Sequence, residues 1–78
     1  MPTVLRAFGL RFVIYSNDHE PAHVHVIKGN GEAKIDLWPQ TPRLVWCEGL
    51  SHKEVRHAYE AVLEHREFLK KKWDEIHD

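Results

Sequence analysis

Cysteine is nearly absent from this sequence, since Cys47 is the only one, and this scarcity excludes an internal disulfide and a zinc knuckle built from cysteines. We expect Cys47 to serve as a small core side chain. Long apolar runs are also absent: stretches such as residues 12–15 are far too short to cross a bilayer, and the first residues lack the pattern of a signal peptide. We therefore expect a cytoplasmic protein without a membrane segment.

An excess of charge of either sign is missing as well. Eleven Lys and Arg residues face twelve Asp and Glu residues, which leaves a formal net charge of −1. This balance excludes a basic field over the whole protein of the kind that drives non-specific binding to nucleic acid, so any such contact would need a local patch. Hydrophobic residues make up 42% of the chain, which is typical of a folded protein, and 78 residues suffice for one domain.

The first half of the chain has the pattern of short strands, because β-branched and aromatic residues cluster between Gly and Pro. Leu10, Phe12 and Ile14 alternate with more polar neighbours, as in a half-buried strand. Residues 16–22 are rich in Ser, Asn, Asp and Pro and predict a loop of defined shape. The predicted strands cover residues 4–8, 10–15, 23–28, a stretch around 33–37, and 44–47.

Asn30 and Gly31 form the strongest hairpin signal in the sequence, because a type I′ turn needs positive φ at both central residues. A two-residue loop at these positions places His25 opposite Asp36. The apolar and polar residues then separate onto two faces of the sheet. The expected core face carries Val24, Val26, Ala33, Ile35 and Leu37, and the other face carries His23, His25, Lys34, Asp36 and Trp38.

The second half begins with a capping box, Ser51 at the N-cap and Glu54 at N3, which predicts the start of a helix. Apolar residues then recur at spacings of three, four and seven, as on one face of a helix. The sequence therefore predicts an α+β fold in a single domain, residues 1–78. It consists of an antiparallel β-meander of four to five strands within residues 3–48 and one long C-terminal helix, about residues 51–76, packed on one face.

Histidine is abundant in the segment from Ser16 to Val26, and one interpretation is a metal site. Imidazole and carboxylate are preferred ligands of Zn and similar divalent ions, and two residues at i and i+2 of a strand point the same way. His19, His23 and His25 could thus hold a divalent metal, the one cofactor that the sequence suggests. Their spacing matches no specific metal signature, so a solvated polar face is the alternative interpretation.

Acid–base chemistry is a second interpretation of the same face, with Asp36 orienting His25 for proton transfer near neutral pH. Such a surface, with cations for phosphate and aromatic rings for base stacking, would suit RNA. A purely structural role of these residues is the competing explanation. The candidate catalytic residues are His23, His25, Asp36, Arg11 and Lys34, and the candidate binding residues are Tyr15, Trp38 and His19.

Several stretches match a family pattern: Phe12 followed by residues 16–21 and 23–26, the hairpin segment 31–35, and the helix residues 49–51, Glu54 and 64–67. On these residues the chain resembles a bacterial family, the domain of unknown function 4160, with Ala22 where the family often has proline. The resemblance implies a component of a toxin–antitoxin-like pair, acting with a cognate small protein encoded nearby, and the sheet-face residues add RNA as the expected substrate. It names no catalytic residue.

Three functions thus remain as expectations, and the sequence leaves open whether the protein is an enzyme. The first is the toxin–antitoxin-like component with activity on RNA. The second is a non-catalytic module that docks a cognate small partner through its open sheet face. The third is a histidine-based metal-binding protein. The oligomeric state does not follow from the sequence.

Overall fold

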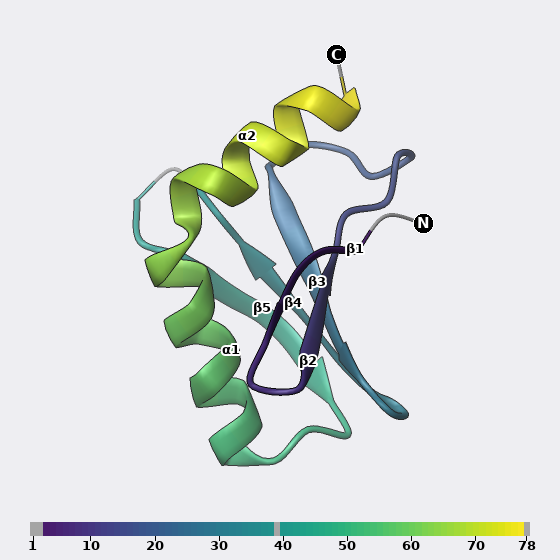
Figure 1. Ribbon diagram of the computed structural model, residues 1–78, viewed down its shortest axis with the longest axis vertical. Helices are drawn as coiled ribbons and strands as arrows, with labels where there is room; N and C mark the ends of the chain where they lie inside the picture. The colour runs from purple at the N-terminus through teal and green to yellow at the C-terminus, as the bar shows by residue number, and fades with distance from the viewer. Residues whose placement is uncertain (1–2, 39, 78) are drawn as a thin grey trace.

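Five strands form one antiparallel sheet in chain order, and two helices follow them, in a computed structural model that describes residues 3–38 and 40–77 (Figure 1). The predicted α+β meander is therefore confirmed. The elements are β1 (Thr3–Ala7), β2 (Leu10–Val13), β3 (His23–Lys28), β4 (Gly31–Asp36), β5 (Arg43–Glu48), α1 (His52–Glu64) and α2 (Arg66–His77).

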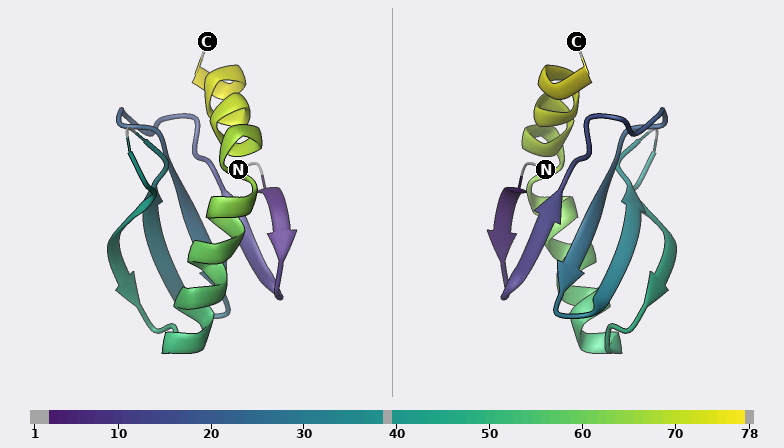
Figure 2. Two further views of the ribbon diagram at one scale, coloured as in Figure 1. Left: turned by 90° about the vertical axis from the view of Figure 1, so that its left-hand side faces the viewer. Right: turned by 90° about the vertical axis from the view of Figure 1, so that its right-hand side faces the viewer.

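Both helices lie on one face of the sheet, and no helix of residues 3–38 and 40–77 covers the opposite face (Figure 2). The core forms between the helices and the alternating apolar residues of the strands, because burial removes their apolar surface from water. The predicted core face is confirmed, whereas Cys47 is exposed on β5 and the expectation of a core cysteine is wrong. The buried cluster comprises Leu10, Phe12, Ile14, Ala22, Val24, Val26, Ala33, Ile35, Leu37, Ala58, Ala61, Val62, Leu69 and Trp73.

The capping box forms as predicted. The Ser51 Oγ accepts the Glu54 N–H at 3.1 Å, and the Glu54 carboxylate accepts the Ser51 N–H at 2.8 Å. The backbone hydrogen bond from Ser51 is the main cause of a lowered pKa of Glu54, to which Lys28 adds. The expected single helix is interrupted at His65, with φ −109° and ψ 23°, so that α1 and α2 have different directions (Figure 1).

The break at His65 keeps the apolar stripe in contact with the sheet. Leu69 and Trp73 of α2 remain buried, and α2 packs near the start of β3. No described helix combines the length and the apolar character that crossing a membrane would require.

The register of the β3–β4 hairpin differs from the expected one by two residues. His23, not His25, lies opposite Asp36, and His25 lies opposite Lys34. The loop therefore consists of Gly29 and Asn30, and the positive φ of 57° falls on Gly29. Because side chains alternate with period two, a shift by two leaves every residue on its expected face.

Gly31 belongs to β4 and has a different structural role from the one expected. It packs against the backbone of Gly49, and a Cβ atom added at Gly31 would collide with the Gly49 carbonyl. The expectation that Gly31 is a loop residue is therefore wrong. Glycine is required there for a close approach between two chain segments.

Candidate metal-binding site

The loop between β2 and β3 brings Asp18 back onto the face of the sheet that carries no helix. A local turn fixes this position: the Asp18 N–H donates to the Tyr15 carbonyl at 3.1 Å, and the Tyr15 N–H donates to Asp18 Oδ2 at 3.3 Å. An aspartate that bonds the nearby backbone in this way is typical of a tight loop. The turn places the Asp18 carboxylate beside the histidines of β3.

Asp18, His23 and His25 converge on one point. Asp18 Oδ2 lies 3.2 Å from His23 Nε2 and 3.5 Å from His25 Nε2, and one ligand atom from each of the three residues lies within 4.8 Å of the other two. Their side chains are only 16%, 4% and 13% exposed, respectively. We call these three residues the histidine–aspartate cluster. Two imidazoles and one carboxylate are a ligand set that divalent transition metals use.

The outer nitrogen of each imidazole is held by an oxygen that accepts hydrogen bonds. His23 Nδ1 donates to the Pro21 carbonyl at 2.8 Å, and His25 Nδ1 lies 2.9 Å from the Glu32 carboxylate. Since a carbonyl or carboxylate oxygen only accepts, both Nδ1 atoms carry a proton. In the neutral rings the lone pairs are then on Nε2 and point toward Asp18, which is the arrangement found behind metal-ligating histidines.

Tyr15 stands beside the cluster, with its ring centroid 4.8 Å from that of His25. Burial raises the pKa of the Tyr15 phenol, the negative charges of Glu32 and Asp18 raise it further, and Arg11 opposes them. Tyr15 therefore keeps its proton at neutral pH and offers an O–H donor next to His25.

Two tryptophans flank the histidines on opposite sides. Trp73 of α2 lies 5.0 Å from His23 between ring centroids and donates its indole N–H to Glu20 at 3.3 Å. Trp46 of β5 lies 6.2 Å from His25 and is 42% exposed. The cluster is thus closed by a buried indole on the helix side and borders an exposed one toward the sheet edge.

The structure separates the predicted site residues into two groups. His23, His25, Lys34 and Asp36 share a sheet face as expected, but the pairing of His25 with Asp36 is wrong. Asp36 is 5% exposed and accepts from Arg43 Nη2 at 3.2 Å. His19 is exposed and lies outside the cluster.

Sequence reasoning missed two residues of this site. Glu32 replaces Asp36 as the carboxylate partner of His25, because the register differs by two residues. Asp18 completes the cluster, and its only signal in the sequence was the turn-forming composition of the loop. Arg11 lies near Tyr15 and partly offsets the rise of its pKa, and Lys34 lies between His25 and Trp46 in the strand ladder.

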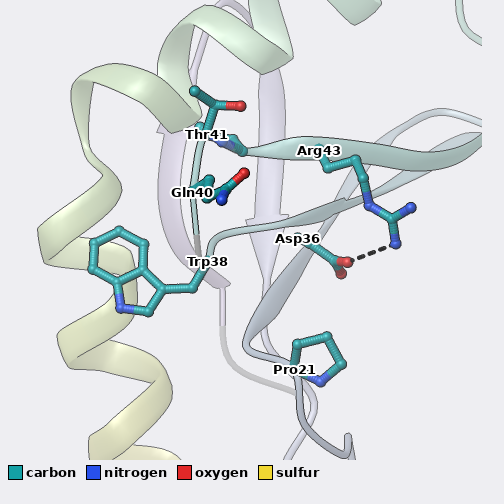
Figure 3. Close-up of a pocket in the computed structure, with 7 residues that line it drawn as sticks. Pro21, Asp36, Trp38, Gln40, Thr41 and Arg43 are labelled. Carbon is teal, nitrogen blue, oxygen red and sulfur yellow. Dashed lines mark hydrogen bonds and ion pairs between the residues drawn. The ribbon is translucent and has the colours of Figure 1, made fainter.

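Trp38 does not lie on the open face, so this expectation is wrong. Its ring packs against the core, and the guanidinium carbon of Arg66 lies 3.8 Å from the ring centroid. In Figure 3 the indole of Trp38 lies beside the helix ribbon, whereas the Asp36 carboxylate points the other way, toward Arg43. Residue 39, which follows Trp38, lies outside the described residues.

A hollow of about 380 Å³ lies between the side chains of Trp38 and Asp36 (Figure 3). None of the histidine–aspartate cluster lines it, and its charged lining residues, Asp36 and Arg43, neutralise each other. The hollow is therefore a weaker candidate for a functional site than the histidine–aspartate cluster. Its lining residues are Pro21, Asp36, Trp38, Gln40, Thr41, Pro42 and Arg43.

Fold and site together define a small α+β protein with a two-histidine, one-carboxylate cluster at the end of an antiparallel sheet. The chain belongs to the family described as Domain of unknown function (DUF4160), whose model matches residues 9–74. Neither a curated protein nor a solved structure matches the chain. The family resemblance is thereby confirmed, while the toxin–antitoxin role, the activity on RNA and the small protein partner stay predictions.

Proposed function

We propose that this protein binds a divalent transition-metal ion through Asp18, His23 and His25. One observation carries the proposal: both Nε2 atoms point at a single carboxylate oxygen, while both Nδ1 atoms are held by accepting oxygens. A merely solvated polar face would not require both imidazoles to be oriented from behind. The partial burial of all three side chains also favours a bound cation, because it would neutralise Asp18.

The spacing of the ligand atoms supports the proposal. Metal–ligand bonds of about 2.0–2.2 Å in tetrahedral geometry separate two ligand atoms by about 3.4 Å. The distances from Asp18 Oδ2 to the two Nε2 atoms, 3.2 and 3.5 Å, agree with this value. One ligand atom from each of the three residues lies within 4.8 Å of the other two, so an ion would draw these atoms together by at most about 1.4 Å.

Three protein ligands leave at least one coordination position for water or a substrate oxygen. This is the arrangement of catalytic metal sites, whereas structural sites are closed by four protein ligands. An ion held here would lower the pKa of a bound water and make it a nucleophile at neutral pH. The activity on RNA that the sheet-face residues suggest would then use this water in place of the His25–Asp36 pair.

Metal analysis of protein purified without a histidine tag tests the proposal. We expect about one divalent ion per chain and a tight Co(II) complex with a visible absorption spectrum typical of nitrogen and oxygen ligands. His25→Ala and Asp18→Asn should abolish both, with an unchanged circular dichroism spectrum. His19→Ala and His52→Ala remove exposed histidines outside the cluster and should leave both unchanged.

The opposite pattern would contradict the proposal. A native protein that contains no metal and leaves the Co(II) spectrum unchanged would refute metal binding. An ion that survives His25→Ala but is lost in His52→Ala would place the site elsewhere.

A further inference from the structure

Strand β5 is an unprotected edge of the sheet. Among the described residues it pairs with β4 alone, and Figure 2 shows it along the outer border. All six of its residues are exposed, including Leu44, Val45 and Trp46 at 39%, 38% and 42%. The strand contains neither Lys nor Pro, the residues that most often prevent pairing at an edge. Its outward N–H and C=O groups and its apolar side chains are therefore available to another strand.

A β-bulge gives β5 a symmetric pattern. Ile35 lies opposite Leu44 and Lys34 opposite Trp46, so Val45 is an extra residue that shares one position with Trp46. Counted in this way, the side chains of the strand alternate between the two faces of the sheet, and the order of faces is the same from either end of the strand. Leu44 and Cys47 lie on the helix face, and Arg43, Trp46 and Glu48 lie on the other face, together with their partners in β4.

We propose that two copies of this chain pair through antiparallel β5 strands, with a two-fold axis between Val45 and Trp46. In this register Leu44 lies opposite the second copy's Cys47, on the helix face. Val45 lies opposite the second copy's Trp46. Each apolar side chain thus meets an apolar side chain on its own face of the sheet.

Charge complementarity favours a second copy of this chain as the partner of β5. Arg43 at one end of β5 lies opposite the second copy's Glu48, and the two-fold axis repeats this pair at the other end. The Arg43 side chain is 72% exposed despite its contact with Asp36, so it is free to bridge to a second carboxylate. A one-residue slip would place residues of opposite faces against each other and would lose both charge pairs.

The dimer has a consequence for the cluster, although it does not depend on metal binding. The two-fold axis is perpendicular to the sheet, because each face meets the same face of the second copy. Both helix layers then lie on one side and both histidine–aspartate clusters on the other. Since the ring centroids of Trp46 and His25 are 6.2 Å apart, each histidine–aspartate cluster lies next to the proposed dimer interface.

Charge reversal tests the register. Arg43→Glu and Glu48→Arg each place like charges opposite one another at both ends, and either variant should weaken dimerisation roughly tenfold in sedimentation equilibrium. An equimolar mixture of the two variants restores complementary charges and should form a heterodimer of near wild-type affinity. Glu60→Arg, the same charge change at an exposed position of α1, should leave the dimer intact.

A cysteine pair provides a second readout that does not depend on Arg43 and its contact with Asp36. Leu44→Cys places a thiol opposite the second copy's native Cys47, and mild oxidation should give a covalent dimer. In the wild-type chain the two Cys47 residues would be two strand positions apart, about 7 Å along the strands and about 5 Å across them, which is too far for a disulfide. The wild-type protein should therefore not be cross-linked.

A wild-type chain that stays monomeric up to roughly 1 mM would overturn the proposal. A dimer that neither Glu48→Arg weakens nor Leu44→Cys cross-links would overturn it as well, because it would use another surface.

Discussion

Glu32 accepts a hydrogen bond from His25 Nδ1 at 2.9 Å, while Asp18 faces the opposite ring nitrogen at 3.5 Å. The imidazole thus lies between two carboxylates. Glu32 orients the ring through Nδ1, and Asp18 lies next to Nε2. Carboxylates that orient a ligating histidine raise its basicity and fix its tautomer.

The first prediction follows from this relationship. Glu32→Ala should lower Co(II) affinity about 10- to 100-fold without abolishing binding, because it removes the group that orients His25 but no ligand. Competition titration against a chelator measures the change. Glu48→Ala is the matched control, since Glu48 lies opposite Glu32 on β5 but, within the part of the chain that the structure describes, forms neither a hydrogen bond nor an ion pair with His25. Equal losses in the two variants would contradict the orienting role of Glu32.

The phenol of Tyr15 provides a prediction on pH. Burial first, and then the charges of Glu32 and Asp18, raise its pKa above 10.0. A raised pKa in the folded state means that folding favours the protonated phenol. The stability it contributes is therefore fully present below pH 10 and is lost as the pH rises through the raised value.

Alkaline titration of phenolate absorbance in a Tyr59→Phe background isolates Tyr15, since these are the two tyrosines of the chain. The midpoint should lie above 10.0, and Asp18→Ala should shift it downward because a negative charge is removed. A midpoint at or below 10.0 would show that the phenol is not shielded from water.

Two glycines of the β3–β4 hairpin should respond differently to alanine. Gly29 has a positive φ of 57° with open space around it, so Gly29→Ala should cost about 1 kcal/mol of unfolding free energy from backbone strain. Gly31→Ala would push a Cβ atom into the Gly49 carbonyl and the Leu50 side chain and should cost more, roughly 3 kcal/mol. Urea unfolding measures both, and a larger loss at Gly29 would contradict the close packing of Gly31 on Gly49.

The same glycines show why the strands were predictable and their register was not. Alternation of apolar residues is local, so His23–Lys28 and the core face could be predicted from the sequence. The loop was ambiguous because glycine stands on both sides of Asn30. The contact between Gly31 and Gly49, which favours the observed loop position, joins residues eighteen positions apart in the sequence (49 minus 31).

The candidate site was predictable in part for the same reason. His23 and His25 share a face by strand periodicity alone, and that much holds. Asp18 reaches them only through the path of a loop, which depends on tertiary contacts. The helix break at His65 was missed because the apolar stripe continues across it from Val62 to Leu69.

Arg66 joins the start of α2 to the end of the sheet, and its shape as well as its charge should matter. The guanidinium lies 3.8 Å over the Trp38 ring, and Nε donates to the Leu37 carbonyl at 2.6 Å. Lysine keeps the charge but has no plane to stack on the indole and no fixed fork of donors. Arg66→Lys should therefore lower the free energy of unfolding by about 1–2 kcal/mol, from the lost stacking and the lost hydrogen bond.

Urea unfolding of Arg66→Lys and of Arg56→Lys, the same substitution at an exposed position of α1, separates shape from charge. The control should stay within about 0.5 kcal/mol of the wild-type protein, because Arg56 lies on the solvated helix face. If both variants lost the same stability, the stacking of Arg66 on Trp38 would contribute nothing. The double variant Arg66→Lys/Trp38→Leu completes the comparison. If it lost no more stability than Trp38→Leu alone, while Arg66→Lys by itself was destabilised, the two side chains would be shown to act as one unit.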